Sequence, residues 1–226
     1  IESVWWLLGQ MYEKNLLYKG YTIQPYSPAA GTGLSSHELN LPGTYKDVKD
    51  TSCTAMFEVK SNEKSKALFE PLLAELNDYR NSGNPTLLSR VGSPNELKMS
   101  DVSLCAWTTT PWTLPSNTAL TVNGNIEYYL VETINIYTKQ WCMVIIAKAL
   151  FSKWFKVEGD ASTDVRKSQL NGTKPGEIYD TWFIHKSFKG SDLVGLQYEQ
   201  LLPYAAPMYD TDKAFQVIAG DFVTTE

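Results

Sequence analysis

The sequence has few of the residues that metal centres and redox sites use most. Among 226 residues there are three cysteines, Cys53, Cys105 and Cys142, and no two of them form a Cys-x-x-Cys pair. Widely spaced cysteines in an odd number disfavour both a zinc site and a disulfide framework. We therefore expect no bound metal, and three unpaired thiols fit a reducing cytoplasm.

Long apolar runs and clusters of basic residues are also missing. No stretch approaches the roughly 18 apolar residues of a membrane-spanning helix, and Glu2 interrupts the start, where a secretory leader would be apolar. The formal net charge is −5, from 20 Lys and Arg against 25 Asp and Glu. Because phosphate binding needs clustered cations, this balance argues against a general nucleic-acid coat but permits local recognition of a nucleotide end.

What the sequence does have is enough apolar surface for a sizeable core. Hydrophobic residues make up 43% and aromatic residues 12% of the chain, which excludes a disordered tail. The length suits one large domain or one domain with an appendage. The chain also starts and ends abruptly, so we expect a piece of a larger protein.

Hydrophobic periodicity predicts many strands and few helices. Apolar residues at helical spacing predict helices over residues 1–19, 63–82 and 147–155. Alternating or short apolar runs predict strands at residues 21–26, 52–60, 102–108, 119–122, 126–132, 140–146, 181–188, 192–196 and 214–219. Residues 25–43 predict a loop, and residues 61–100 and 158–180 are candidate peripheral insertions. This order favours a mixed α/β, β-rich and barrel-like domain.

The most informative stretch is a stiff loop that follows a predicted strand. Val102, Leu104 and Ala106 alternate with polar or small residues, as a half-buried strand does. The sequence then reads Trp-Thr-Thr-Thr-Pro-Trp-Thr-Leu-Pro-Ser-Asn from Trp107 to Asn117. Prolines lack an N–H and restrict the residue before them, so the chain leaves the strand here and presents hydroxyls and unpaired backbone groups. Threonines are also ordinary strand residues, but loops on rigid scaffolds are where binding and chemistry concentrate.

This stretch resembles the threonine-rich motif in the editing (CP1) domain of isoleucyl-tRNA synthetases, which are class I aminoacyl-tRNA synthetases. The valyl and leucyl enzymes share the motif more loosely. Further segments resemble the same family in the same order along the chain, and they are residues 1–6, 17–20, 45–50, 189–199 and 220–226. The ordered set is more specific than any one motif. The sequence of residues 31–39 resembles the isoleucyl type more than the valyl type.

The resemblance implies a role for each residue of this loop. Thr108, Thr109 and Thr110 would line a pocket for the terminal adenosine of tRNA and its mischarged amino acid. The backbone of residues 113–116 would face the adenine, and Asn117 matches a position implicated in editing. The predicted catalytic residues are therefore Thr108, Thr109, Thr110 and Asn117, and the predicted substrate-binding residues are Trp107, Trp112, Thr113, Leu114, Pro115 and Ser116. Hydroxyls and an amide can orient a water and a ribose hydroxyl at an ester carbon without a metal or a covalent intermediate.

The resemblance also implies a domain organisation and a function. Residues 1–44 would connect from the synthetase body, and residues 45–226 would be the editing domain, ending before its second active-site motif. Its reaction would be hydrolysis of the aminoacyl ester of valine mischarged onto tRNA(Ile), as part of an isoleucine-tRNA ligase. The implied partners are the 3′-terminal aminoacyl-adenosine of tRNA and the rest of the synthetase chain, with a monomeric fragment and no membrane. The domain would need no cofactor, because only the full-length synthetase would use ATP and magnesium.

One departure from the family pattern concerns a motif that would follow Glu226. In the family this motif contains Gly-Thr-Gly, a histidine and a downstream aspartate that is held to anchor the substrate's ammonium group. Residues 1–226 therefore need not be active by themselves. Two other functions stay open, namely the matching domain of a valyl enzyme, which would clear threonine, and a non-catalytic module that grips the tRNA acceptor end.

Other candidate residues have simpler interpretations. Gly31 and Gly33 lack the rest of a phosphate-loop signature, so a plain turn is expected there. His37 is expected on a surface loop and His185 at a structural position in a strand. Neither histidine begins the His-x-Gly-His signature that class I synthetases use for ATP. Residues 1–226 are therefore expected to lack the aminoacylation site.

Overall fold

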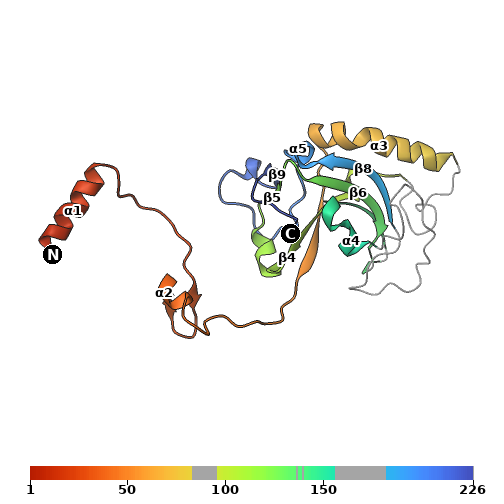
Figure 1. Ribbon diagram of the computed structural model, residues 1–226. Coiled ribbons are helices and arrows are strands. Elements are labelled where there is room, and N and C mark those ends of the chain that lie inside the picture. The colour runs from red at the N-terminus through yellow and green to blue at the C-terminus, as the bar shows by residue number, and fades with distance from the viewer. Residues whose placement is uncertain (83–95, 136, 139, 156–181, 226) are drawn as a thin grey trace. The chain divides into compact units, whose positions relative to one another are not determined.

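The computed structural model describes residues 1–82, 96–135, 137–138, 140–155 and 182–225 (Figure 1). The chain divides into two compact units, Ile1–Lys49 and Asp50–Glu226. The predicted insertion at residues 158–180 lies outside the described residues, and the one at residues 61–100 lies partly outside them. No helix in the described part of the chain is long and apolar enough to cross a membrane.

The first unit holds one amphipathic helix and a short hairpin. Helix α1 spans Glu2–Glu13, so the helix predicted to residue 19 ends early, and Asn15 then takes a left-handed conformation with φ +56°. Strand β1 (Tyr26–Ser27) pairs with β2 (Thr32–Gly33) in antiparallel fashion, and Gly31 at φ +68° makes the expected turn. The predicted strand at residues 21–26 is wrong except at its last residue, because the residues before it have no neighbouring strand in this unit.

A one-turn helix also interrupts the loop predicted at residues 25–43. Helix α2 spans Ser36–Leu39. The Ser35 hydroxyl accepts from the Glu38 N–H at 3.3 Å, and the Glu38 carboxylate accepts from the Ser35 N–H at 2.7 Å. This capping box satisfies two N-terminal donors at once, which makes a very short helix stable enough to form.

The second unit is built on a five-stranded sheet with a smaller two-stranded sheet beside it. The large sheet has the order β3-β4-β7-β6-β8, and the small one pairs β5 with β9 in parallel. The strands are β3 (Cys53–Glu58), β4 (Val102–Thr108), β5 (Ala119–Val122), β6 (Glu127–Ile134), β7 (Trp141–Ala147), β8 (Trp182–Lys189) and β9 (Gln216–Ala219). These bounds confirm the corresponding sequence predictions within a few residues.

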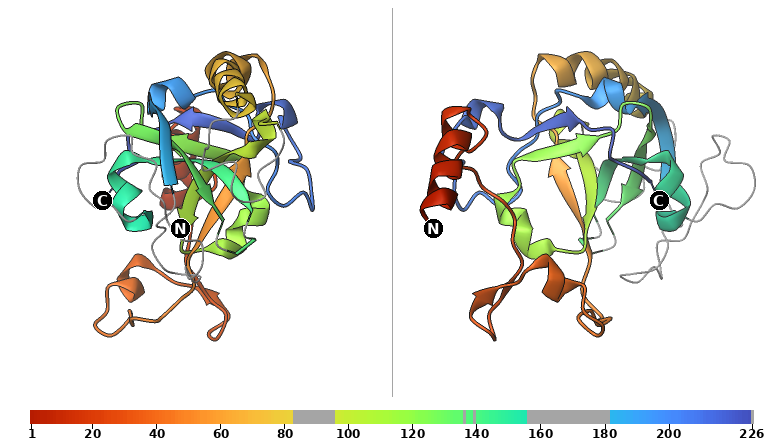
Figure 2. Two further views of the ribbon diagram at one scale, coloured as in Figure 1. Left: turned by 90° about the vertical axis from the view of Figure 1, so that its right-hand side faces the viewer. Right: turned by 60° about the vertical axis from the view of Figure 1, so that its left-hand side comes forward.

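The helices of the second unit connect and cover these strands. They are α3 (Glu63–Asn81), η2 (Met99–Asp101), η3 (Pro111–Ser116), η4 (Lys148–Leu150), α4 (Phe151–Trp154), α5 (Gly190–Leu193) and η5 (Thr211–Lys213), where η marks a 3₁₀ helix. The predicted helices at residues 63–82 and 147–155 are confirmed, the second as η4 followed by α4. Helix α3 runs along one side of the large sheet in both figures (Figure 1; Figure 2).

The large sheet buries apolar side chains on both faces. We call the first cluster the main core, which contains Phe57, Phe69, Leu130, Ile145, Leu196 and Val217 among others. The second core lies on the opposite face and contains Val131, Val144, Ile146, Phe151, Phe155 and Trp182. Alternation along β6 sends Leu130 to the main core and Val131 to the second, as the two-residue period of a strand requires. Helix α3 therefore closes one face and α4 the other.

The mixed α/β class is confirmed, but the described strands do not close into the predicted barrel. Closure requires the two edge strands of a sheet to pair, and the edges β3 and β8 form no ladder with each other. Instead, residues 197–199 extend the β3 edge, because Lys60 donates to the Gln197 carbonyl and Glu199 donates to the Glu58 carbonyl. An isolated bridge joins Gln197 to Gln216 of β9. Residues 197–199 thus connect the two sheets without closing them.

The predicted strand at residues 192–196 is wrong. Helix α5 occupies its start, because the Asp192 carboxylate accepts from the Lys189 N–H at 2.9 Å and caps the first turn. Leu193, at the end of this helix, is fully buried in the main core. A capping carboxylate one turn into the segment was the sequence signal for this helix.

Candidate functional site

Strand β4 carries the threonine stretch out of the core. Its first three residues are buried, and they alone pair with β7 in the described ladder. From there β4 pairs with β3 only, up to the last pair between Thr108 and Cys53. Trp107, one residue earlier, is 61% exposed. The residues predicted to act on a substrate therefore begin in the part of β4 that has only β3 as a neighbour.

The three threonines form a tight polar turn at the end of β4. The Thr110 N–H donates to the Thr108 hydroxyl at 3.0 Å, and the two hydroxyls lie 3.2 Å apart. This side-chain-to-backbone bond across two residues is the usual threonine turn. It holds the Thr108 and Thr110 side chains together. Thr109 between them is exposed, and its hydroxyl has no hydrogen bond to any described residue.

The 3₁₀ helix η3 follows directly and presents most of its side chains to solvent. Pro111 occupies its first turn, where a missing N–H costs nothing. The Thr113 N–H and hydroxyl both donate to the Thr110 carbonyl, at 3.0 and 2.7 Å. Leu114 packs against the main core and anchors the turn. The exposed members are Trp112, Thr113, Pro115 and Ser116, and all of them belong to the predicted substrate-binding set.

Asn117 ends the loop with its side-chain amide held at both ends. Its Oδ1 accepts from the Tyr198 hydroxyl at 2.7 Å, and its Nδ2 donates to the Ala119 carbonyl at 3.0 Å. Its backbone N–H also donates to the Leu114 carbonyl at 3.1 Å. The side chain is half-buried. The structure therefore gives Asn117 a part in holding the loop, and its catalytic role stays a prediction.

Tyr198 is a functional candidate that the sequence reasoning missed. It lies 81 residues beyond Asn117 and is only 1% exposed. Burial raises the pKa of its phenol far above the ordinary value of 10, so the hydroxyl stays a protonated donor. No local pattern pairs two residues at this separation. The available signal was the alternation of Leu196 and Tyr198 with polar Gln197 and Glu199, which places the tyrosine on a buried face where its hydroxyl needs a partner.

The backbone is strained at Phe215, which is hydrogen-bonded to both Thr118 and Tyr198. Phe215 has φ +58°, a left-handed conformation that bulky side chains adopt at a cost of about 1–3 kcal/mol. Its N–H donates to the Thr118 carbonyl at 2.7 Å, and its carbonyl accepts from the Tyr198 N–H at 2.9 Å. Two hydrogen bonds therefore hold this conformation between the end of the loop and Tyr198.

The loop brings the ten predicted site residues into one continuous surface element, but it brings no charge. Residues 107–117 contain no Asp, Glu, Lys, Arg or His. Their groups are hydroxyls, one amide, two indoles and backbone N–H and C=O. Such groups can orient a water or an ester, but they cannot serve as a strong acid or base near neutral pH.

The two histidines lie apart from this loop. His37 is exposed on α2, as expected for a surface residue. The His185 ring is buried in β8, where its Nε2 lies 2.7 Å from Glu132 Oε2. The other Glu132 oxygen accepts from the Trp141 indole N–H at 2.8 Å. This Glu132–His185–Trp141 cluster is a satisfied polar group inside the sheet, which confirms the structural role expected for His185.

A one-residue bulge in β8 makes this cluster possible. Leu130 pairs with Lys186 but the next residue, Val131, pairs with Ile184, so His185 is left without a partner in the ladder. Bulges redirect side chains and are features of the fold rather than defects. The sequence predicted the strand but not the extra residue in it.

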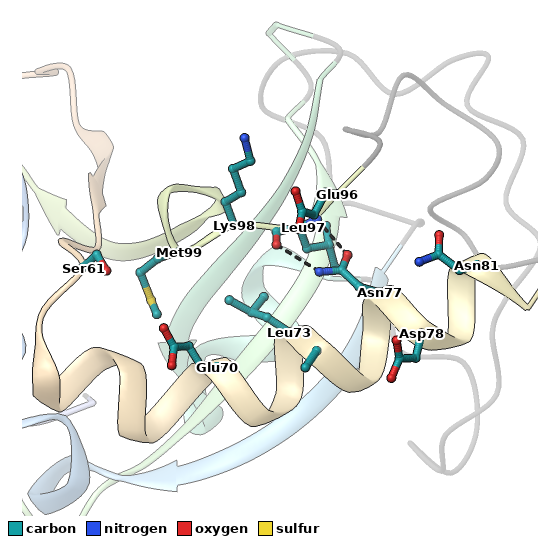
Figure 3. A pocket seen from close by; sticks show the side chains of 11 residues that line it. Ser61, Glu70, Leu73, Asn77, Asp78, Asn81, Glu96, Leu97, Lys98 and Met99 are labelled. Atoms are coloured by element: carbon teal, nitrogen blue, oxygen red, sulfur yellow. Dashed lines mark hydrogen bonds between the residues drawn. The ribbon is translucent and has the colours of Figure 1, made fainter.

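A pocket of about 690 Å³ lies between α3 and residues 96–99 (Figure 3). Asn77 ties these segments together, because its amide donates to the Leu97 carbonyl and accepts from the Leu97 N–H. The residues that line the pocket include three carboxylates, those of Glu70, Asp78 and Glu96, but only one cation, Lys98. An excess of negative charge disfavours a polyanion such as tRNA. The pocket is also separate from the threonine loop, none of whose residues line it.

Sequence comparison places the whole chain beside a group of larger enzymes. The family model for tRNA synthetases class I (I, L, M and V) matches residues 1–187. The isoleucine–tRNA ligase of Cytophaga hutchinsonii is 50% identical and that of Bacteroides fragilis 46% identical, each over 226 residues and 100% of this chain. The matched region is 17% and 16% of those relatives, so the chain spans about one sixth of their length.

Two solved structures match with low scores. The crystal structure of GlLeuRS-CP1 has a TM-score of 0.43 at 17% identity, covering 77% of this chain and 50% of that chain. The P. knowlesi cytosolic leucyl-tRNA synthetase editing domain has a TM-score of 0.38 at 13% identity, covering 78% and 55%. Similarity at this level carries no weight for the assignment.

Proposed function

The chain belongs to the class I tRNA synthetases of the isoleucine, leucine, methionine and valine group, and from this membership we propose that it is the editing domain of an isoleucyl-tRNA synthetase. Residues 1–44 would be part of the connection to the synthetase body. The domain would hydrolyse valine wrongly esterified to the 3′-terminal adenosine of tRNA(Ile). The isoleucine–tRNA ligase relatives, at 50% and 46% identity, support the isoleucyl over the valyl alternative.

The need for such a reaction follows from the small difference between the two amino acids. One methylene is worth only about 1–3 kcal/mol in a pocket, a figure known from isoleucyl enzymes themselves rather than from this chain. A single binding site therefore charges valine at a low but damaging rate. A second, smaller pocket can admit the valyl ester and exclude the isoleucyl ester.

The observation that carries the proposal is the uncharged, hydroxyl-rich loop of residues 107–117. The hydrogen-bonded pair Thr108 and Thr110 supports a fixed turn. Thr109, whose hydroxyl has no partner among the described residues, is then the group available to a water or to the ester. The exposed rings of Trp107 and Trp112 suit stacking on a base. Thr113 to Ser116 would present their backbone to the adenine.

The chemistry that fits this loop is positioning rather than strong acid–base catalysis. A water held in line with the ester carbon gains from orientation alone, and an N–H aimed at the developing oxyanion stabilises the transition state. No cofactor or metal is proposed for this step, and ATP and magnesium would serve only the full-length synthetase. The partners would be the aminoacyl end of tRNA and the rest of the synthetase chain, in the cytoplasm.

The proposal is tested by Thr109→Ala and Asn117→Ala in the full-length synthetase. Loss of a positioning or oxyanion group should slow hydrolysis of valyl-tRNA(Ile) about 10²-fold, while isoleucine charging stays unchanged. Thr211→Ala removes an exposed threonine hydroxyl outside the loop and is the matched control. Unchanged valyl-tRNA hydrolysis in both loop variants would remove the site assignment. Preferential hydrolysis of threonyl-tRNA(Val) would favour the valyl alternative, and binding without hydrolysis would favour an acceptor-end binding module.

A further inference from the structure

Tyr198 is held rigidly from three sides. Its ring packs edge-on against Phe57, with centroids 5.2 Å apart, and against Phe215, with centroids 6.1 Å apart. Its backbone bridges to Val59 in antiparallel fashion, within the segment that joins the large and the small sheets. The hydroxyl that reaches Asn117 therefore comes from a buried side chain that two ring contacts and a backbone bridge hold in place.

The partners of Asn117 allow only one orientation of its amide. Oδ1 accepts from the Tyr198 hydroxyl and Nδ2 donates to the Ala119 carbonyl. The opposite orientation would set Oδ1 against the Ala119 carbonyl, an acceptor against an acceptor. One of the two Nδ2 hydrogens is left without a partner among the described residues. Tyr198 and Ala119 thus determine where that free N–H lies.

Backbone hydrogen bonds also link the two residues of the Tyr198–Asn117 contact through Phe215. Asn117 is joined through Tyr198 to the strained Phe215, and Phe215 returns to Thr118, the residue next to Asn117. Strained conformations persist where surrounding structure over-determines them, and they cluster at functional sites. The strain at Phe215 is an observation independent of the hydroxyl contact, and both converge on the end of the threonine loop.

We propose that Tyr198 is a positioning residue for editing, which holds the Asn117 amide so that its free N–H is available to the ester bound at the loop. The proposal rests on the proposed function. At 1% exposure Tyr198 does not touch the substrate, so it acts through Asn117.

The test is Tyr198→Phe in the full-length synthetase, with kcat and KM measured for hydrolysis of valyl-tRNA(Ile). The substitution removes only the hydroxyl and keeps the ring contacts. We expect kcat to fall about tenfold, less than for complete loss of an oxyanion donor, with KM nearly unchanged. On an Asn117→Ala background, Tyr198→Phe should have no further effect, because the residue through which it acts is gone. Unchanged kcat, or losses that multiply in the double variant, overturns the proposal.

Phe57→Leu is the control for a merely structural role. It loosens the packing around the same ring but leaves the hydroxyl bond in place. We expect it to lower the resistance to urea while kcat is retained, and an equal loss of kcat at matched stability overturns the positioning role. If the parent synthetase does not hydrolyse valyl-tRNA(Ile), the proposed function itself fails, and if Thr109→Ala and Asn117→Ala leave hydrolysis intact, the site assignment fails. If they impair it and Tyr198→Phe does not, only the positioning role fails.

Discussion

Replacing His185 by leucine should destabilise the second unit strongly, because it leaves the buried Glu132 side chain without one of its two partners. Glu132 is 2% exposed, and its two side-chain partners are His185 at 2.7 Å and Trp141 at 2.8 Å. Breaking a buried pair by removing one partner costs about 3–5 kcal/mol. Since the Trp141 bond remains, we expect about 3 kcal/mol, near the lower end.

The matching double variant separates this cost from loss of packing. In Glu132→Leu/His185→Leu both polar groups are gone, and the Trp141 N–H is the group left without an acceptor, at about 1–3 kcal/mol. The double variant should therefore be no less stable than His185→Leu alone. Replacement of a buried pair by apolar residues of similar volume is often neutral or stabilising.

The assay is urea unfolding followed by circular dichroism, with thermal melts beside it. For a chain of this size about 3 kcal/mol corresponds to a fall in Tm of roughly 6–12 °C. Strictly additive losses, with the double variant as unstable as the sum of Glu132→Leu and His185→Leu, would refute the reasoning. So would a His185→Leu variant within about 0.5 kcal/mol of the parent protein, which is the range of ordinary surface substitutions.

Two further predictions concern a glycine and two half-buried thiols. Gly190→Ala should cost about 1–3 kcal/mol in urea unfolding, because its Cβ would lie 2.0 Å from the Asn123 carbonyl oxygen; Gly124→Ala, with contacts of 3.8 Å, should not. Burial raises the pKa of the Cys105 and Cys142 thiols from 9.0 to about 12. Because each thiol has a higher pKa in the folded than in the unfolded protein, its contribution to folding stability is complete at pH values below the unfolded pKa. The free energy of unfolding should therefore fall as the pH rises from 9 towards 12. Cys105→Val should lose stability less steeply in that range, and equal slopes would contradict this.

Local patterns were enough to predict most strands. Alternation from Val102 to Ala106 and the prolines at 111 and 115 placed β4 and the loop after it, because both signals act between near neighbours. The same reasoning missed α2 and α5. In both, a carboxylate caps the first turn, Glu38 in α2 and Asp192 in α5. A cap of this kind outweighs weak periodicity in a short segment.

The contacts that hold the candidate site are long-range and were not predictable in the same way. The loop residues themselves follow from the sequence, since they are consecutive. Their anchor does not, because Asn117 meets Tyr198 across 81 positions and only the folded sheets bring the two together. The buried Glu132 with His185 is a similar case at 53 positions. That the described strands do not close into a barrel depends on how residues 197–199 bridge two sheets, which no single segment encodes.

Because of the bulge at His185, even-numbered residues of β8 face one side of the sheet before it and the other side after it. Phe188 belongs to the main core and pairs opposite Tyr128, whereas Ile184 and Trp182, also even-numbered, pack into the second core. A strand without the extra residue would turn one half of these side chains to the wrong face. Homologous chains should therefore vary in the identity of residues 182–188 far more freely than in their number.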